Sequence, residues 1–258
     1  MTNRIYNHKK DILKGNEHKF TSQYHIISSQ LLPPSFDLRT SGNMPEILDQ
    51  GQIGTCAGNQ ISNALKFCLK KEKAALLFQP SRLFIYYFTR FLEGSPVTED
   101  TGISVKGACD SIRKYGVCSE NNWGYDITKY TIEPVNQAIK AAKTHINCSY
   151  LLVSQDLIHI KQALFSGFPI VFGIQIYDSF ESDQVAKTGI VPMPDTSKES
   201  KLGGHSISLI SYNDTTQTFT CANSWNSTWG QKGYFTLPYK YVLDPNLSSD
   251  FWQLRLFK

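Results

Sequence analysis

Hydrophobic residues recur at the spacing of a helix face in several stretches of the first two thirds of the chain. Steps of three and four residues predict a helix from Cys56 to about Glu72, with its apolar face at Ala57, Ile61, Ala64, Leu65 and Cys68. A nearly all-apolar run after Pro80-Ser81 predicts a buried helix. Further helical patterns span 104–115, with Ser104 as N-cap and Gly116 as stop, 133–145 and 154–165.

The last third of the chain has the pattern of strands. Short runs of β-branched and aromatic residues, separated by turn residues such as Asn213-Asp214, predict strands over 170–174, 206–212, 219–223 and 233–237. Helices first and antiparallel strands later indicate the α+β class. Residues 118–131 are the expected crossing between the two parts.

Composition limits the kinds of partner that the protein can have. The chain has 258 residues, is 41% hydrophobic and carries a formal net charge of +4. It is long enough to bury a sizeable core, as one two-lobed domain or as two small ones. The charge is too small to predict nucleic acid or an anionic membrane as partner, and no apolar run reaches the length that spans a bilayer.

Cys56 is the first residue of the predicted helix and follows a loop punctuated by Gly51 and Gly54. Free backbone N–H groups and the positive end of the helix dipole stabilise a thiolate there, which is the nucleophilic form of cysteine. Alternatively, Cys56 is a small buried apolar residue. A general base elsewhere in the chain would favour the interpretation of Cys56 as a nucleophile over that of a buried apolar residue.

The sequence supplies such a base and its usual companions. His205 follows two glycines, and Asn223 precedes Ser224-Trp225. These residues stand 149 and 167 positions after Cys56, and Gln50 stands six before it. The four polar positions resemble those of the papain-like, cathepsin-type cysteine peptidases.

The resemblance extends from about Pro33 to the C-terminus and implies an overall architecture. It implies a papain-like two-lobed fold with an active-site cleft between a helical lobe and an antiparallel β-barrel-like lobe. We expect the helical lobe over about 45–130 and the β lobe over about 131–245 together with 33–44.

The resemblance also implies the role of each site residue. His205 would accept the Cys56 proton, Asn223 would orient the imidazole, and Gln50 would donate to the oxyanion. Trp225 would shield the His–Asn hydrogen bond, and Gly102, Gly203 and Gly204 would contact substrate. The rival histidines, His145 and His159, lie inside helical patterns. No cofactor is implied, and no Cys-x-x-Cys pair indicates a metal site.

Among the cathepsins, the motifs around His205 and Asn223 are most similar to those of cathepsin B. The His-His insertion that gives cathepsin B its dipeptide-removing activity has no counterpart between Trp123 and Val135, which predicts an endopeptidase acting on proteins or peptides. An acid at the far end of the substrate pocket, where Ser248, Ser249 or Asp250 would lie, would favour basic side chains. The alternatives are a Cys-His acyltransferase or amidase, and a non-catalytic binding module on a peptidase fold.

The cysteines and the N-terminus bear on the compartment. Secreted relatives have a cysteine three residues before the nucleophile, where this chain has Ile53. The five cysteines besides Cys56 are therefore expected to be mostly reduced thiols, and the first residues lack the apolar core of a secretory signal. We expect a cytoplasmic or other reducing compartment and a microbial or viral source that does not secrete the protein, with packaging in the virion if it is viral.

Residues 1–31 form a separate polar segment with few apolar residues. Five basic and two acidic side chains give it most of the net charge. It would not fold alone. The family resemblance suggests a short inhibitory pro-segment, and we expect Phe20 to Ile27, its most apolar stretch, to lie across the cleft.

Overall fold

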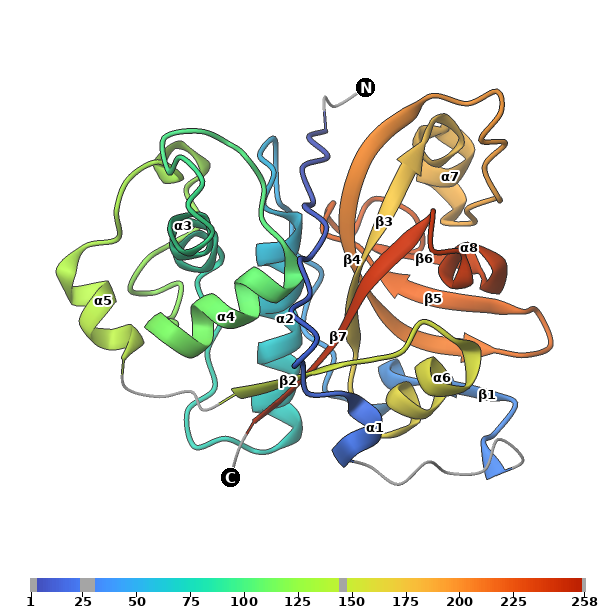
Figure 1. Ribbon diagram of the computed structural model, residues 1–258, viewed down its shortest axis with the longest axis horizontal. Helices are drawn as coiled ribbons and strands as arrows, with labels where there is room; N and C mark the ends of the chain where they lie inside the picture. The colour runs from blue at the N-terminus through green and yellow to red at the C-terminus, as the bar shows by residue number, and fades with distance from the viewer. Residues whose placement is uncertain (1–3, 24–30, 144–147, 257–258) are drawn as a thin grey trace.

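The computed structural model describes residues 4–23, 31–143 and 148–256. Figure 1 shows two lobes side by side, one of helices and one built on a sheet. The helical lobe contains α2 (Cys56–Lys71), α3 (Arg82–Leu92), α4 (Val105–Tyr115) and α5 (Asn136–Ala142). The α+β class predicted from the pattern and the two lobes implied by the family resemblance are confirmed.

The helix ends follow the expected local chemistry. Ser81 accepts a hydrogen bond from the Phe84 amide at the start of α3, and Ser104 accepts one from the Gly107 amide at the start of α4. Gly116 ends α4 with φ +76°, a conformation that costs glycine little.

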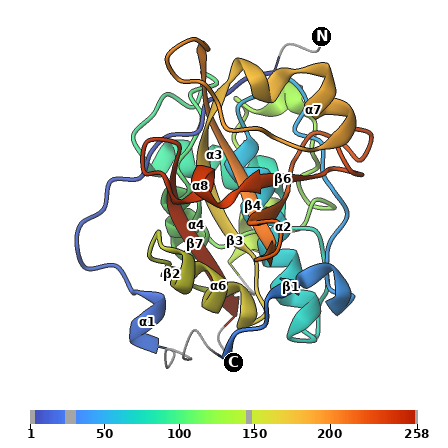
Figure 2. The same cartoon turned by 90° about the vertical axis from the view of Figure 1, so that its right-hand side faces the viewer.

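The β lobe is built on one antiparallel seven-stranded sheet. Its order is β2-β7-β3-β4-β5-β6, and β1 pairs with β4 off this path. The strands are β1 (Ser35–Asp37), β2 (Cys148–Leu152), β3 (Ile170–Tyr177), β4 (Lys201–Asn213), β5 (Thr218–Ala222), β6 (Tyr234–Pro238) and β7 (Ser248–Leu256). Figure 2 shows α6 (Leu157–Phe165) and α8 (Tyr239–Leu243) on the outer side of the sheet, and α7 (Asp183–Thr188) at its upper end.

Helix α2 forms the boundary between the lobes. It packs against β4, β7 and β3 on one side and against α3 and α4 on the other, so one helix belongs to both cores (Figure 1). This arrangement fixes its N-terminus relative to the sheet. In the described residues, no helix has the length and apolar character that a membrane crossing requires.

The two lobes divide the chain differently from the ranges expected from sequence. Helix α5 lies with the helical lobe (Figure 1), where the Ala142 carbonyl packs on Gly116 at the end of α4. Strand β7 continues the sheet well beyond residue 245 and pairs with both β2 and β3. The sheet-bearing lobe therefore begins nearer β2 than residue 131 and includes the C-terminal strand.

The N-terminal segment lies between the lobes, seen as the blue trace in front of α2 in Figure 1. Asn7 forms a bridge with Gly204 of β4, and Lys9 forms one with Ser104 at the start of α4. The expectation that Phe20 to Ile27 crosses the cleft is wrong for its described part. Phe20 begins α1 (Phe20–Gln23), beyond the bridge from Lys19 to Leu152, and 24–27 lie outside the described residues.

Candidate active site

Cys56 is the first residue of α2 and is fully buried. Burial raises the pKa of its thiol to about 11, although hydrogen bonds from the Ser206 and Ala57 amides lower it. The expectation of a stabilised thiolate therefore does not hold in this form of the protein. The helix N-terminus is present as predicted, but here removal from water outweighs it.

His205 lies on β4, and Ser206, the residue that follows it, donates its amide hydrogen bond to the Cys56 thiol. The Nε2 of His205 is 2.8 Å from the Asn223 Oδ1. Its Nδ1 is buried and has no hydrogen-bond partner among the residues that the structure describes. The imidazole thus has one nitrogen held by Asn223 and the other unengaged.

Trp225 covers the His–Asn pair. Its ring stacks on the His205 ring at 4.7 Å between centroids and 26° between planes. Only 1% of Asn223 is exposed, so the hydrogen bond to His205 is shielded from water. Ser224, between Asn223 and Trp225, also donates its amide hydrogen bond to the Asn223 Oδ1, which fixes the orientation of that side chain.

Burial lowers the pKa of His205 to about 3, and the charges of His8 and Arg4 lower it further, whereas the hydrogen bond that His205 donates to the Asn223 Oδ1 raises it. With the Cys56 pKa raised and the His205 pKa lowered, the pair is neutral in this form. An ion pair of thiolate and imidazolium needs water or substrate polar groups in place of the segment that buries it.

Gln50 is buried in the loop before α2. Its Oε1 accepts a hydrogen bond from Ser224, and its Nε2 donates one to the Ile53 carbonyl at 3.1 Å. Its backbone amide donates to the Ser224 carbonyl at 2.9 Å. These bonds hold Gln50 beside the loop of Asn223 and leave one side-chain N–H hydrogen for another acceptor.

The three glycines predicted to contact substrate all contact the N-terminal segment. A Cβ on Gly102 would overlap the Asn7 carbonyl, and one on Gly203 would lie 2.7 Å from Tyr6. The His8 amide donates to the Gly204 carbonyl at 2.9 Å. The absence of side chains on these glycines therefore lets a peptide backbone closely approach β4 on one side and the loop before α4 on the other.

Three further residues shape the site and were missed or left open from sequence. Asp100 accepts hydrogen bonds from the Gly54 amide at 2.8 and 3.0 Å and thereby holds the loop before Cys56. Gly173 makes room for the His8 ring, and Asp250 lies 3.2 Å from the His8 Nε2. A glycine inside the apolar strand 170–174 is a sequence signal for such a close approach, whereas nothing local marks Asp100.

The rival histidine His159 pairs with Asp156 at the start of α6, and His145 lies outside the described residues. Within the described part of the chain, no group of three or more His, Cys, Asp or Glu side chains has a metal-binding arrangement. All six cysteines are free and buried.

Comparisons with known proteins find relatives that match most of the chain. The family model described as "Papain family cysteine protease" matches residues 32–244. An uncharacterized peptidase C1-like protein of Acanthamoeba polyphaga mimivirus is 41% identical over 258 residues, covering 95% of this chain and 82% of the relative. Cathepsin B-like cysteine proteinase 4 of Caenorhabditis elegans is 26% identical, covering 83% of this chain and 72% of the relative.

Among solved structures, xylellain, a cysteine protease from Xylella fastidiosa, superposes with a TM-score of 0.87 at 31% identity, covering 100% of this chain and 98% of xylellain. Digestive procathepsin L 3 of Tenebrio molitor larval midgut gives a TM-score of 0.68 at 19% identity, covering 93% of this chain and 75% of that one. The second likeness concerns the fold alone.

Proposed function

Because the chain belongs to the papain family of cysteine proteases and is a cysteine-type peptidase, we propose that it is an endopeptidase with Cys56 as nucleophile and His205 as base. The observation that carries this proposal is the bond between the His205 Nε2 and Asn223, which leaves the His205 Nδ1 as the proton acceptor. The amide contact from Ser206 to the thiol supports a position of Cys56 beside that strand.

In the proposed reaction the Cys56 thiol gives its proton to the His205 Nδ1, and the sulfur bonds to the carbonyl carbon of the scissile peptide. The Cys56 amide and the Gln50 Nε2 donate to the oxyanion. The imidazolium then protonates the leaving amine as the C–N bond breaks. Water, deprotonated by His205, hydrolyses the thioester and restores the thiol.

Replacement of Asn223 by alanine tests the role of the His–Asn pair. Without the Oδ1 acceptor, the imidazole loses its fixed orientation, and we expect kcat to fall by about 100-fold with little change in KM. Peptide hydrolysis by the variant is compared with that by Asn246→Ala, an exposed asparagine of the same lobe. Equal kcat values in the two folded variants would remove Asn223 from the mechanism.

We further propose that the N-terminal segment restrains the enzyme by occupying the cleft. Arg4 lies 3.9 Å above the Trp225 ring and pairs with Glu181 at 2.8 Å. Tyr6 packs edge-on against His205 at 6.0 Å. Together with the backbone contacts of His8 and Lys9, these residues support a segment that displaces substrate from the site.

Asp11 gives the docked segment a pH dependence. Burial raises the pKa of its carboxyl from 3.8 to about 6, as does the charge of Asp250, while hydrogen bonds from Trp252 and Lys106 and the charge of His8 lower it. The docked form therefore binds a proton more tightly than the free segment. This contribution to docking is fully present below pH 3.8 and is lost as pH rises through about 6.

We expect the N-terminal segment of the full-length chain to leave the cleft as pH rises from about 4 to about 7. The equilibrium constant for its docking should fall by up to about 100-fold over this range. The measurement is the alkylation rate of Cys56 divided by that of a chain beginning at Leu32, which cancels the titration of the thiol itself. In Asp11→Asn the ratio should be nearly independent of pH. The same pH dependence in the variant and the parent would rule out Asp11 as its source.

The position of His8 supports a preference for basic side chains in the substrate. Its ring is buried against Asp250, with Nε2 and Oδ2 3.2 Å apart and side-chain exposures of 2% and 5%. Gly173 leaves the space that the ring fills, and Gly204 lies against the His8 carbonyl and Cβ. We propose that a substrate lysine, arginine or histidine takes the place of His8 in this pocket.

Asp250→Asn tests this preference because it keeps the size of the side chain and removes its charge. With peptides that differ only at this position, we expect kcat/KM for the basic peptide to fall by about tenfold relative to the neutral one. Asp244→Asn, at the preceding turn of the same lobe, serves as control. An unchanged ratio in Asp250→Asn would contradict the pocket assignment.

A further inference from the structure

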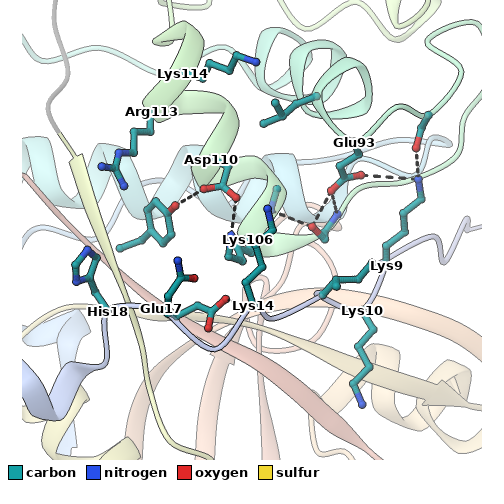
Figure 3. Close-up of a pocket in the computed structure, with 17 residues that line it drawn as sticks. Lys9, Lys10, Lys14, Glu17, His18, Glu93, Lys106, Asp110, Arg113 and Lys114 are labelled. Carbon is teal, nitrogen blue, oxygen red and sulfur yellow. Dashed lines mark hydrogen bonds and ion pairs between the residues drawn. The ribbon is translucent and has the colours of Figure 1, made fainter.

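A cavity of about 960 Å³ lies between the N-terminal segment and the helical lobe, apart from the residues of the active site. Figure 3 shows Lys106 and Arg113 extending from α4 on one side, with Lys14 and His18 on the segment opposite. Tyr150 of β2 also lines the cavity. Its volume is in the range of small-molecule sites.

The lining of this cavity is basic. Six lysine or arginine side chains stand against three carboxylates, a formal excess of +3 in a chain whose total is +4. The cations are Lys9, Lys10, Lys14, Lys106, Arg113 and Lys114. Most of the net charge of the protein is thus collected around one cavity, which attracts anions.

The three carboxylates of the lining already have partners. Asp110 pairs with Lys106 and accepts from Tyr150, and Glu93 accepts from Ser104 and lies 3.8 Å from Lys9. Glu17 accepts the Lys14 and Gly15 amides. These contacts hold each of the three carboxylates on the wall of the cavity to which it belongs.

Several cations of the lining are not neutralised in this way. Lys10, Lys14, Arg113 and Lys114 form no ion pair with any residue that the structure describes. In Figure 3, the amines of Lys10 and Lys114 point away from the other labelled cations, whereas Arg113 extends on the side where His18 lies. An anion in the cavity would therefore meet Arg113, Lys14 and His18 first.

We propose that this cavity binds a soluble small molecule with two or more phosphate groups, and that the bound anion holds the N-terminal segment in the cleft. The planar guanidinium of Arg113 suits bidentate contact with a phosphate group, and Lys14 adds a point charge from the other wall. A ligand with several phosphate groups can contact the cations of both walls at once, which a ligand with a single phosphate group does less well.

The effect on the segment follows from the position of the cations. Arg113 and Lys106 belong to the helical lobe, whereas Lys14 and His18 belong to the segment, so an anion that contacts both walls binds the docked form better than the open form. By linkage, its binding shifts the equilibrium toward the docked form. The part of the proposal in which the anion holds the segment in the cleft rests on the proposed restraint of the enzyme by its segment. The part in which the cavity binds the anion does not.

Calorimetric titration of the full-length chain with tripolyphosphate at low ionic strength tests the site. We expect saturable binding that weakens with added salt. Arg113→Gln and Lys14→Gln should each raise Kd by about tenfold. Lys187→Gln, which removes an exposed lysine of α7 in the other lobe, should leave Kd unchanged.

Two further arms complete the test. Tripolyphosphate should slow alkylation of Cys56 severalfold in the parent but not in Arg113→Gln. The protein should not bind to phosphatidylcholine vesicles that contain phosphatidic acid. Lack of saturable binding, equal weakening by Arg113→Gln and Lys187→Gln, or binding to the vesicles alone would overturn the site. Binding without any effect on alkylation would overturn only the link to the segment. Calorimetry needs no activity, so a failure of the catalytic assignment leaves this result readable.

Discussion

Cys56→Ala should lower the rate of peptide hydrolysis by about five orders of magnitude. The proposed mechanism has no other atom that forms the thioester, so the whole nucleophilic pathway is lost and only weak background hydrolysis remains. The variant should fold normally, because the side chain becomes smaller by one sulfur atom at the start of α2. The assay is single-turnover and steady-state hydrolysis of an unstructured polypeptide with basic residues.

The matched control is Cys148→Ala, which removes another buried free cysteine at the start of β2. Its activity should stay within a few fold of the parent, after allowance for a small loss of stability. Cys56→Ala as active as the parent would exclude Cys56 as the nucleophile. Loss of activity in both variants with retained folding would also contradict the account.

The double variant Arg4→Ala/His8→Ala should raise kcat/KM for a small peptide by about 100-fold. It removes the contact of Arg4 with Trp225, its ion pair with Glu181 and the His8–Asp250 pair. Contacts of this kind together contribute on the order of 3 kcal/mol, which corresponds to about 100-fold in the docking equilibrium. The rise in kcat/KM is expected only under conditions in which the segment of the parent protein is mostly docked.

Leu13→Ala is the control for this result, because Leu13 lies on the same segment and is 48% exposed. It should leave kcat/KM unchanged. The double variant keeps Phe20, which is 4% exposed, and the Asp11–Trp252 hydrogen bond of 2.5 Å, so that a failure to fold is not expected. If the double variant and Leu13→Ala have the same activity as the parent, the segment does not restrain the enzyme.

The helices of the first lobe could be predicted because their signals are local. The apolar period and the caps Ser81, Ser104 and Gly116 fixed the start of α3 and both ends of α4 to within a residue or two. Strand β7 could not be predicted in this way, because its buried Gln253 and Arg255 interrupt the apolar pattern. These side chains hydrogen-bond across the sheet to the α6 end, for example Gln253 to the Ala163 carbonyl at 2.7 Å, and such partners are invisible in the local sequence.

For the site, the sequence identified Gln50, Cys56, His205 and Asn223, because each stands in its own short motif, but it gave no local signal for Asp100. It could not predict the protonation of Cys56 and His205. The start of α2 favours a thiolate, but Arg4, Tyr6 and His8 exclude water from the pair, and burial then reverses the direction of the pKa shift. The N-terminal segment docks through contacts with residues that are far away in the sequence. Because the segment itself has no hydrophobic periodicity, the sequence contains no pattern that predicts this docking.

The same reason explains the error about which part of the segment enters the cleft. Hydrophobicity pointed to Phe20 and its neighbours, whereas the cleft accepts Arg4 to Asp11 through backbone bonds, charge pairs and ring contacts. A peptidase cleft recognises backbone first, and glycines such as Gly102 and Gly204 allow that approach for a polar chain as well as for an apolar one.

The central claim is that Cys56 is an ionisable nucleophile that the N-terminal segment covers. The most direct measurement is intact-mass labelling with a thiol alkylator at about pH 5, where only a strongly activated cysteine is ionised. The full-length chain, the chain beginning at Leu32 and Arg4→Ala/His8→Ala are labelled side by side. We predict one adduct, on Cys56, formed quickly in the two opened forms and slowly in the full-length chain. Absence of a Cys56 adduct in the folded opened forms would contradict the thiolate–imidazolium pair, and equal rates in all three would contradict the covering segment.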